Sequence, residues 1–216
     1  MVIAGHQPNF LPNLAFFLKM NRVDLFVIST NLRFERKDGW MRRNKIVTTQ
    51  GDTWLTVPVF GSQYQQIKDV KIDNHKDWAD KHVHILNATY KKTKGSQFLD
   101  KILSVYEKEW TRLVDLNMAF ILLFKDILGI KTKVVVDEEI TGVKHTIFIN
   151  VCKKYGADTF VSGIGAKHYL TDEGLKEIEK NNISHVFIEK DLTPYKYSLV
   201  HYLLLEGKDW VKEKLS

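Results

Sequence analysis

The chain has few of the residues that form disulfides, linkers and membrane spans. Its one cysteine, Cys152, cannot form a disulfide within the chain, which is typical of proteins from a reducing compartment. Four prolines and twelve glycines leave little room for flexible linkers. The longest apolar runs, such as residues 118–124, are much shorter than the ~20 residues that cross a bilayer. Residues 1–5 lack the basic leader of a signal peptide, so we expect a cytoplasmic protein without membrane insertion.

Phosphate-binding fingerprints and metal-ligand clusters are also missing. Neither GxGxxG nor GxxxxGKS/T occurs, so no glycine-rich nucleotide loop is expected. His82 and His84 lie two residues apart on a predicted helix and would point away from each other. Cys152 on a helix face is best interpreted as a core residue, and spacing reveals no serine–histidine or cysteine–histidine pair. The sequence therefore indicates neither a metal nor a cofactor.

Short apolar strands alternate with helical patterns at both ends of the chain. Strands are predicted over residues 2–4, 24–29, 133–136, 159–161 and 185–188. Helices are predicted from Pro12, over 78–128 with breaks near 95 and 111, over 144–154 and over 172–180. This alternation favours a single α/β domain over residues 1–216, with a mainly parallel Rossmann-like sheet and helices on both faces.

Residues 31–74 follow a different pattern. Segments 46–48 and 53–59 flank a glycine turn and predict a β-hairpin. Pro58 indicates that the second strand lies at the edge of its sheet. Residues 67–72 form a third extended piece, so we expect a small β-rich insertion or flap in this region.

The loop after the first strand, GHQPNFLP, carries His6, Gln7 and Asn9 and is stiffened by Pro8 and Pro12. Ligands of open α/β sheets bind beyond the carboxyl ends of the strands, and histidine can act as an acid or a base near neutral pH. The helix N-terminus behind the loop would favour an anionic ligand. We interpret the loop as a candidate active site; alternatively, its polar side chains only cap the helix and fix a turn.

Basic residues gather once, between Arg33 and Lys45, in a chain whose net charge is +6 and whose pI is near 9.2. The cluster consists of Arg33, Arg36, Lys37, Arg42, Arg43 and Lys45, with Phe34 and Trp40 between them. Its arginines suit the geometry of phosphate, which favours a small phosphorylated ligand. RNA binding and a solvated basic loop are the alternatives. The other lysines are scattered as on a solvated surface, so nucleic acid is not the expected partner.

Four residues in this region are candidate substrate-binding residues: Trp40, Arg43, Asn44 and Lys45. In an extended segment, Arg43 and Lys45 alternate around Asn44 and project to one face. A third candidate segment, VSGIGAKHYL, ends a predicted strand; its glycines would let backbone N–H groups approach a ligand, and Ser162, Gly163 and Lys167 would contact it. An ordinary strand–helix turn fits this segment equally well.

Three segments, in this order, resemble the WbqC-like family. They are HQP with LP at residues 6–12, WMRRNKI with TWLTVPV at 40–59, and GADTFVSGIGAKHYL at 156–170. Shorter similarities at 72–74, 78–82, 115–117 and 128–130 extend the resemblance over nearly the whole chain. The chain departs from the family pattern at Asn13, where an aromatic residue is usual, and at His201, where the family has an aspartate.

The resemblance implies an enzyme of surface-polysaccharide or amino-sugar biosynthesis, and we favour acyl or aminoacyl transfer to an amine. His6 would be the general base, with Gln7 and Asn9 orienting the acyl group. Arg43 and Lys45 would hold a phosphate of a sugar nucleotide or of a carrier-bound acyl donor, and Ser162 and Gly163 would line the far wall. On this hypothesis His6, Arg43 and Ser162 converge in one cleft.

Two other functions fit the same residues. The first strand, its histidine-bearing loop and the strand DLFVIS resemble the opening of nucleotidyltransferases, which would use the loop for nucleotide phosphates, although their HxGH motif is absent. A non-catalytic basic module that binds nucleic acid or a protein is the other alternative.

Overall fold

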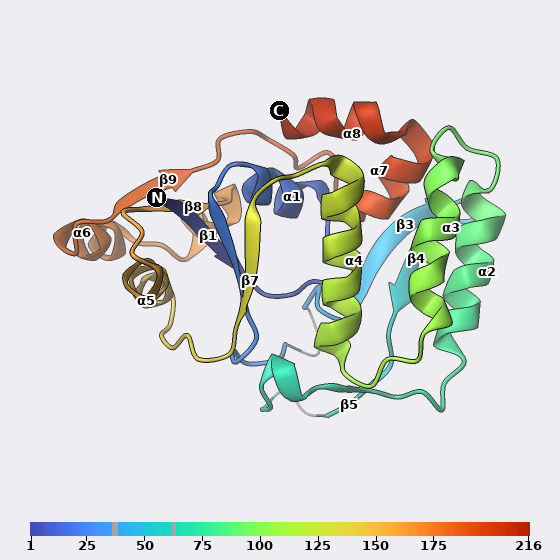
Figure 1. Cartoon of the computed structure of the whole chain (residues 1–216), viewed down its shortest axis with the longest axis horizontal. Helices are drawn as coiled ribbons and strands as arrows, with labels where there is room; N and C mark the ends of the chain where they lie inside the picture. The colour runs from blue at the N-terminus through green and yellow to red at the C-terminus, as the bar shows by residue number, and fades with distance from the viewer. Residues whose placement is uncertain (36–38, 62–63) are drawn as a thin grey trace.

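A five-stranded parallel sheet forms the centre of the computed structural model, which describes residues 1–35, 39–61 and 64–216 (Figure 1). Its strands are β1 (Val2–His6), β2 (Leu25–Ser29), β7 (Lys133–Asp137), β8 (Thr159–Ser162) and β9 (Ser184–Phe187). They lie in the order β7-β2-β1-β8-β9, and all neighbours are parallel. The strand order reverses at β1, so the carboxyl ends of β1 and β8 flank the topological switch point, where sheets of this type bind ligands.

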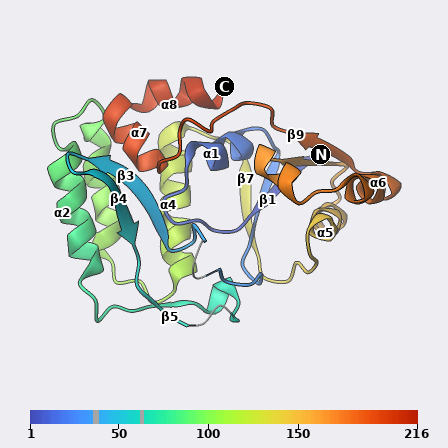
Figure 2. The same ribbon diagram turned by 180° about the vertical axis from the view of Figure 1, so that it is seen from behind.

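Helices cover both faces of this sheet, which confirms the predicted Rossmann-like α/β fold (Figures 1 and 2). The helices next to the sheet and at the end of the chain are α1 (Leu14–Asn21), α5 (His145–Tyr155), α6 (Asp172–Lys180), α7 (Leu199–Glu206) and α8 (Lys208–Leu215). Ile3 belongs to the core on the α5 side, and the next residue, Ala4, to the core on the α1 side. This alternation follows from the two-residue period of a strand, and burial on both faces explains why β2 is apolar in nearly every position.

A long segment between β2 and β7 adds small antiparallel sheets and a group of helices. Its strands and α-helices are β3 (Arg43–Thr48), β4 (Gly51–Thr56), β5 (Val59–Phe60), β6 (Lys71–Ile72), α2 (Trp78–Tyr90), α3 (Leu99–Leu103) and α4 (Leu113–Leu128). Short 3-10 helices are η1 (Ile67–Asp69), η2 (Ser96–Phe98), η3 (Ser104–Glu107) and, after β8, η4 (Ile164–His168). The helical region breaks near residues 95 and 111, as predicted. The assignment of residues 1–216 to one domain, with 31–74 as a flap, stays a prediction.

Among the element boundaries that differ from those that the sequence predicts, three have a clear local cause. The first helix begins at Leu14 and not at Pro12, because the Asn13 side chain accepts the Phe16 N–H at 3.2 Å and caps the helix. The strand predicted over 53–59 stops at Thr56, before Pro58, which has no N–H to donate to a sheet. The segment 67–72 is extended only at its end, because it starts as the 3-10 helix η1.

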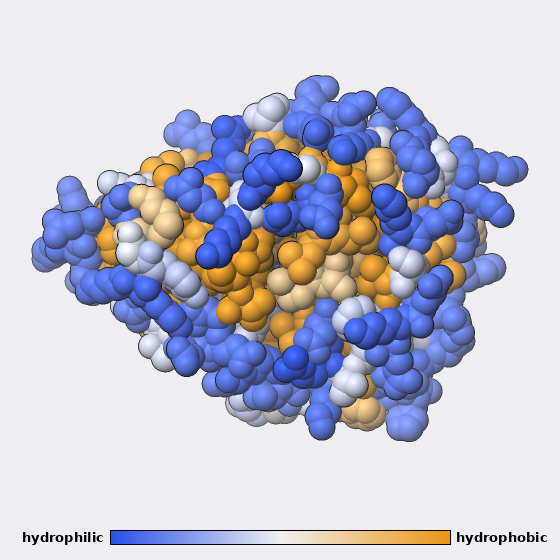
Figure 3. Space-filling model, in the orientation of Figure 1, coloured by the Kyte–Doolittle hydropathy of each residue, from blue (hydrophilic) through white to orange (hydrophobic). Residues whose placement is uncertain are grey.

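Apolar surface gathers over β7 and α4 in the middle of the face shown in Figure 3. Val136 on β7 is 46% exposed and Leu122 on α4 is 44% exposed. β7 is an edge strand, and β2 separates it from β1, so this surface lies apart from the switch point. No helix in the described part of the chain has both the length and the apolar character to span a bilayer.

Candidate functional site

A cavity of about 500 Å³ opens at the switch point, between the carboxyl ends of β1 and β8. Its polar lining consists of His6, Gln7, Asn9, Asn13, Lys19, Ser29 and Ser162. Its apolar wall includes Phe16, Phe148, Phe160 and Tyr169, and Phe148 stacks on Phe160 with their ring centroids 4.3 Å apart. An apolar pocket with a few convergent polar groups is the usual form of a small-molecule site.

His6 is the last residue of β1 and not a loop residue as expected. Its Nδ1 lies 2.9 Å from the carbonyl oxygen of Gln7, which can only accept a hydrogen bond. The proton of the neutral ring is therefore on Nδ1, and Nε2 is the basic nitrogen. Burial and the nearby positive charge of Lys19 lower the pKa of His6 to about 3, so the imidazole is neutral at cellular pH.

Lys19 is a site residue that the sequence analysis missed. It belongs to α1, is only 8% exposed and donates from Nζ to the Gly5 carbonyl at 2.9 Å. Burial lowers the pKa of Lys19 to about 7, because a low-dielectric environment disfavours the ammonium form. The sequence signal was a lone lysine inside the otherwise apolar helix LAFFLKMN. The cavity thus contains an amine that is partly neutral near pH 7.

Ser162 and Gly163 line the opposite wall, at the end of β8. The Ser162 side chain lies 2.7 Å from Nε2 of His185, on the neighbouring strand β9. Lys167, which the sequence places in the same site, is not among the described lining residues; its Nζ lies 5.2 Å from the centre of the Phe187 ring. The structure therefore brings His6 and Ser162 to one cavity.

The basic residues of β3 are linked to this cavity through two tryptophans. Trp40 lines the cavity, and its ring centroid is 6.0 Å from that of Trp54 on β4. Arg43 and Lys45 are both stacked over Trp54, at 4.5 Å and 4.8 Å from its centroid, so they share one face of β3 as predicted. Neither is among the described lining residues, so Arg43 does not join His6 and Ser162 in the wall of the cavity. Arg36 and Lys37 of the predicted cluster lie outside the described residues.

Asn44, a predicted substrate-binding residue, is buried and does not line the cavity in the described structure. It is 2% exposed, and its Nδ2 donates to the Leu11 carbonyl at 2.7 Å. Ser198 donates to the same carbonyl at 2.8 Å. Leu11 has a φ of +43°, a left-handed conformation that is unfavourable for this residue type, so the two donors hold a strained backbone.

A third buried side chain fixes the other end of the same loop. Asn117 of α4 is fully buried and donates from Nδ2 to the carbonyls of Pro8, at 2.8 Å, and Met41, at 2.7 Å. It thereby ties the loop after β1 to the segment that carries Trp40. The loop that presents Gln7 and Asn9 to the cavity is therefore held in place by residues far along the chain.

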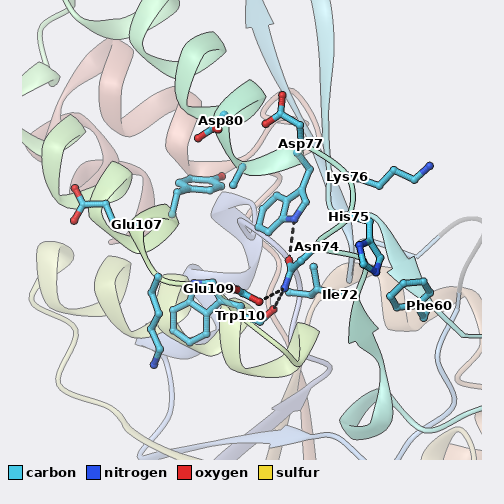
Figure 4. A pocket seen from close by; sticks show the side chains of 14 residues that line it. Phe60, Ile72, Asn74, His75, Lys76, Asp77, Asp80, Glu107, Glu109 and Trp110 are labelled. Atoms are coloured by element: carbon cyan, nitrogen blue, oxygen red, sulfur yellow. Dashed lines mark hydrogen bonds between the residues drawn. The ribbon is translucent and has the colours of Figure 1, made fainter.

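A second hollow, of about 590 Å³, lies near α2 and η3 (Figure 4). Its central polar side chain is Asn74, whose Nδ2 donates to Glu109 and to the Trp110 carbonyl and whose Oδ1 accepts from Trp78. Figure 4 shows these groups joined to one another. Because Asn74 is already paired within the protein, this hollow is the weaker candidate despite its size.

Several other histidine and cysteine side chains lie away from the cavity. Cys152 is buried in the core, and His82 is buried whereas His84 is exposed. Nδ1 of His201 is hydrogen-bonded to the Tyr90 hydroxyl at 2.8 Å. His201 does not line the cavity in the described structure. Among the residues with described positions, no group of three or more histidine, cysteine, aspartate or glutamate side chains is placed to hold a metal ion.

Comparison with known proteins places these residues in a wider context. The sequence model described as "WbqC-like protein family" matches residues 7–202. A protein of Mycobacterium tuberculosis (strain ATCC 25618 / H37Rv), "Uncharacterized protein Rv1507c", is 31% identical over 182 residues, which cover 82% of this chain and 78% of that protein. No solved structure matches the chain. The family match includes the loop after β1, α1 and the β8–η4 segment, and it begins one residue after His6.

Proposed function

Because this chain belongs to the WbqC-like protein family, we propose that it transfers an acyl or aminoacyl group to an amine in surface-polysaccharide or amino-sugar biosynthesis. The observation that carries the proposal is the presence of His6 and Lys19 together in one largely apolar cavity. Amide formation needs an acceptor for the proton of the attacking amine. It also needs a site that keeps water from the activated acyl group.

His6 and Lys19 divide the proton transfer between them in this proposal. When an amine adds to a carbonyl carbon, its N–H becomes much more acidic, so Nε2 of His6 can accept the proton although the imidazole is a weak base. The charge on Lys19 is one cause of the low pKa of His6, so loss of the Lys19 proton makes His6 more basic. A pKa of about 7 for Lys19 matches cellular pH, at which a general base works best.

The remaining lining residues bind the two substrates. The amides of Gln7 and Asn9 orient the acyl carbonyl, and the stacked Phe148 and Phe160 pack against its apolar part. Trp40 connects the cavity to Trp54 and thus to Arg43 and Lys45. These two cations hold the phosphate of a sugar nucleotide or carrier outside the mouth, where a long substrate reaches them while its amine or acyl group lies inside.

Nucleotidyl transfer is the second candidate, and the position of the cavity favours it. Rossmann-like sheets bind nucleotides at the switch point, where His6 and Ser162 lie. On this alternative the loop after β1 contacts a triphosphate, and the reaction releases pyrophosphate.

The test is a product assay with the full chain. A nucleotide-linked amino sugar is incubated with an acyl thioester, an acyl phosphate, or an amino acid with ATP and Mg²⁺, and products are read by mass spectrometry. An amide product that needs both partners, and that is lost in Lys19→Met, supports acyl transfer. Pyrophosphate release without an amide supports the nucleotidyl alternative. Absence of both, with donors and acceptors that bind the protein, contradicts the proposal.

A further inference from the structure

Ser162 and His185 form a close pair that the sequence did not reveal. The two residues come from adjacent parallel strands, and the register pairs Phe160 with His185 and Ser162 with Phe187. Side chains two residues apart on a strand point to the same face, so Ser162 and His185 are diagonal neighbours. The Ser162 hydroxyl is 2.7 Å from Nε2 of His185, a distance typical of a nucleophile and its base.

Ser162 lies at the wall of the cavity, and His185 lies next to it outside the described lining. Ser162 is 3% exposed and lines the cavity, while His185 is half-buried behind it. Gly163 and Gly165, which follow Ser162 along the wall, have nothing within 4 Å of the position that a Cβ would occupy. A substrate carbonyl therefore has space beside the hydroxyl. Burial lowers the pKa of His185, so its ring is neutral at cellular pH and can accept a proton.

The other nitrogen of His185 is unpaired within the protein. Nδ1 of His185 is buried and has no hydrogen-bond partner among the described residues. Such an unpaired buried group is rare and costs stability, and a catalytic role is one explanation for its presence. If Nδ1 carries the proton, Nε2 is free to accept the Ser162 hydroxyl hydrogen, which is the arrangement that a base requires.

We infer that Ser162 is a covalent nucleophile and His185 its general base, an inference that rests on the acyl transfer proposed above. Ser162 Oγ attacks the carbonyl carbon of a thioester or acyl phosphate, and Nε2 of His185 takes the hydroxyl proton. The bond to the leaving group breaks, and the leaving group departs with that proton. The amine then attacks the Ser162 ester and gives its proton to His6, the acceptor proposed above, which returns a proton to Oγ as the ester bond breaks. An amide and free serine result, so atoms and charges balance.

The experiment uses p-nitrophenyl acetate as the acyl donor and the full-length protein. Release of p-nitrophenol is followed optically, and the acetylated residue is located by peptide mass spectrometry. We expect an acetyl group on Ser162, none at this position in Ser162→Ala, and acylation about 10²-fold slower in His185→Gln. Ser184→Ala is the matched control, because Ser184 is exposed and directly precedes His185 without lining the cavity. The Ser184→Ala variant should be acetylated on Ser162 at the same rate as the wild type.

Absence of acetyl from Ser162 in the folded wild-type protein would overturn the inference, as would equal rates in wild type and His185→Gln. If Ser162→Ala does not fold, Ser162→Cys replaces it and should be acetylated at residue 162. The remaining thiol, Cys152, is buried, and burial raises its pKa to about 12, so it adds little background. An amide product that persists in Ser162→Ala would refute the nucleophile and leave the acyl transfer standing. Acetylation of Ser162 without any amide product would support the nucleophile and contradict the acyl transfer to an amine.

Discussion

Lys19 carries a buried charge, and its effect on stability depends on pH. The folded pKa is about 7, well below the value of about 10.4 for an unfolded lysine. Below pH 7 Lys19 is protonated in both the folded and the unfolded state, so the free-energy cost of burying its ammonium group is fully present. Between these two values the unfolded state binds more protons than the folded state, so stability rises with pH.

Replacing Lys19 with Met should therefore stabilise the protein at pH 6, by as much as roughly 4 kcal/mol at about 1.4 kcal/mol per pKa unit. The gain should shrink steadily as the pH rises toward 10. Urea unfolding at several pH values measures it, and the exposed Lys131→Met is the control that should show no such trend. A gain that is the same at pH 6 and pH 10 would mean that Lys19 is not buried as an ammonium ion.

We propose two separable functions for His6, one for each ring nitrogen. Nδ1 holds the Gln7 carbonyl, whereas Nε2 is the proposed proton acceptor. An asparagine at this position can still donate to that carbonyl but has no basic nitrogen. We expect His6→Asn to keep the thermal midpoint close to that of the wild type and to slow turnover about 10²–10⁴-fold.

His6→Ala removes both the hydrogen bond and the basic nitrogen, and it is compared with His6→Asn. It should lose the same activity and, in addition, about 1 kcal/mol of stability with the hydrogen bond to Gln7. Activity and thermal midpoint are measured on the same preparations. If His6→Asn is fully active, the histidine only shapes the end of β1, and the proposed base must be Lys19 alone.

At the scale of elements, the loop between β1 and α1 is a strained connection fixed by helix α4 and strand β3. Asn117 and Asn44 supply the donors that its carbonyls need. Replacing Asn117 with Ala leaves the carbonyls of Pro8 and Met41 unpaired in the interior. The free energy of unfolding should fall by roughly 2–3 kcal/mol, and substrate binding should weaken because the loop is released.

Asn150→Ala is the matched control for this prediction. Asn150 also donates to a backbone carbonyl, that of Thr141 at 2.8 Å, but in an exposed position where water can replace it. Its loss should change stability by less than about 1 kcal/mol. Equal destabilisation by the two variants, measured by urea unfolding, would show that Asn117 does not hold the loop in the way proposed.

At the scale of the whole molecule, the chain carries a net charge of +6, but nucleic acid is not the partner that we expect. Arg33 and Arg43 instead lie over the rings of Tyr64 and Trp54. We expect RNA and DNA to bind at near-physiological salt only weakly and without sequence preference, with Kd of about 10⁻⁴–10⁻⁶ M. Filter binding measures this, and nanomolar affinity would favour a nucleic-acid-binding module over the proposed enzyme.

A separate binding experiment tests the preference for a small phosphorylated ligand. A sugar nucleotide should bind more weakly to Arg43→Ala than to the wild type if this guanidinium holds the phosphate. The variant Lys68→Ala, which changes a lysine that lines no part of the cavity in the described structure, serves as the control. Calorimetric titration gives both affinities, and equal loss in the two variants would point to general charge attraction.

Much of the fold could be predicted from the sequence, because the residue patterns that indicate strands and helices are local. Apolar strands alternating with helices predicted the parallel sheet, and the position of His6 at the end of the first strand predicted a site at its carboxyl end. The errors also have local causes. Asn13 displaced the start of α1 by capping it, and Pro58, which has no N–H to donate, excluded the end of the predicted strand from β4.

By itself, the sequence determined the order and type of the main elements, since periodicity and turn residues act over a few positions. Only the tertiary structure decided which distant side chains meet. Asn117 and Pro8 are 109 residues apart, and Ser162 and His185 are 23 apart, so no spacing rule joins either pair. Their contacts depend on strand order and on the packing of α4, which are set by burial over the whole chain. The low pKa of Lys19 has the same origin, because desolvation is a property of the assembled cavity.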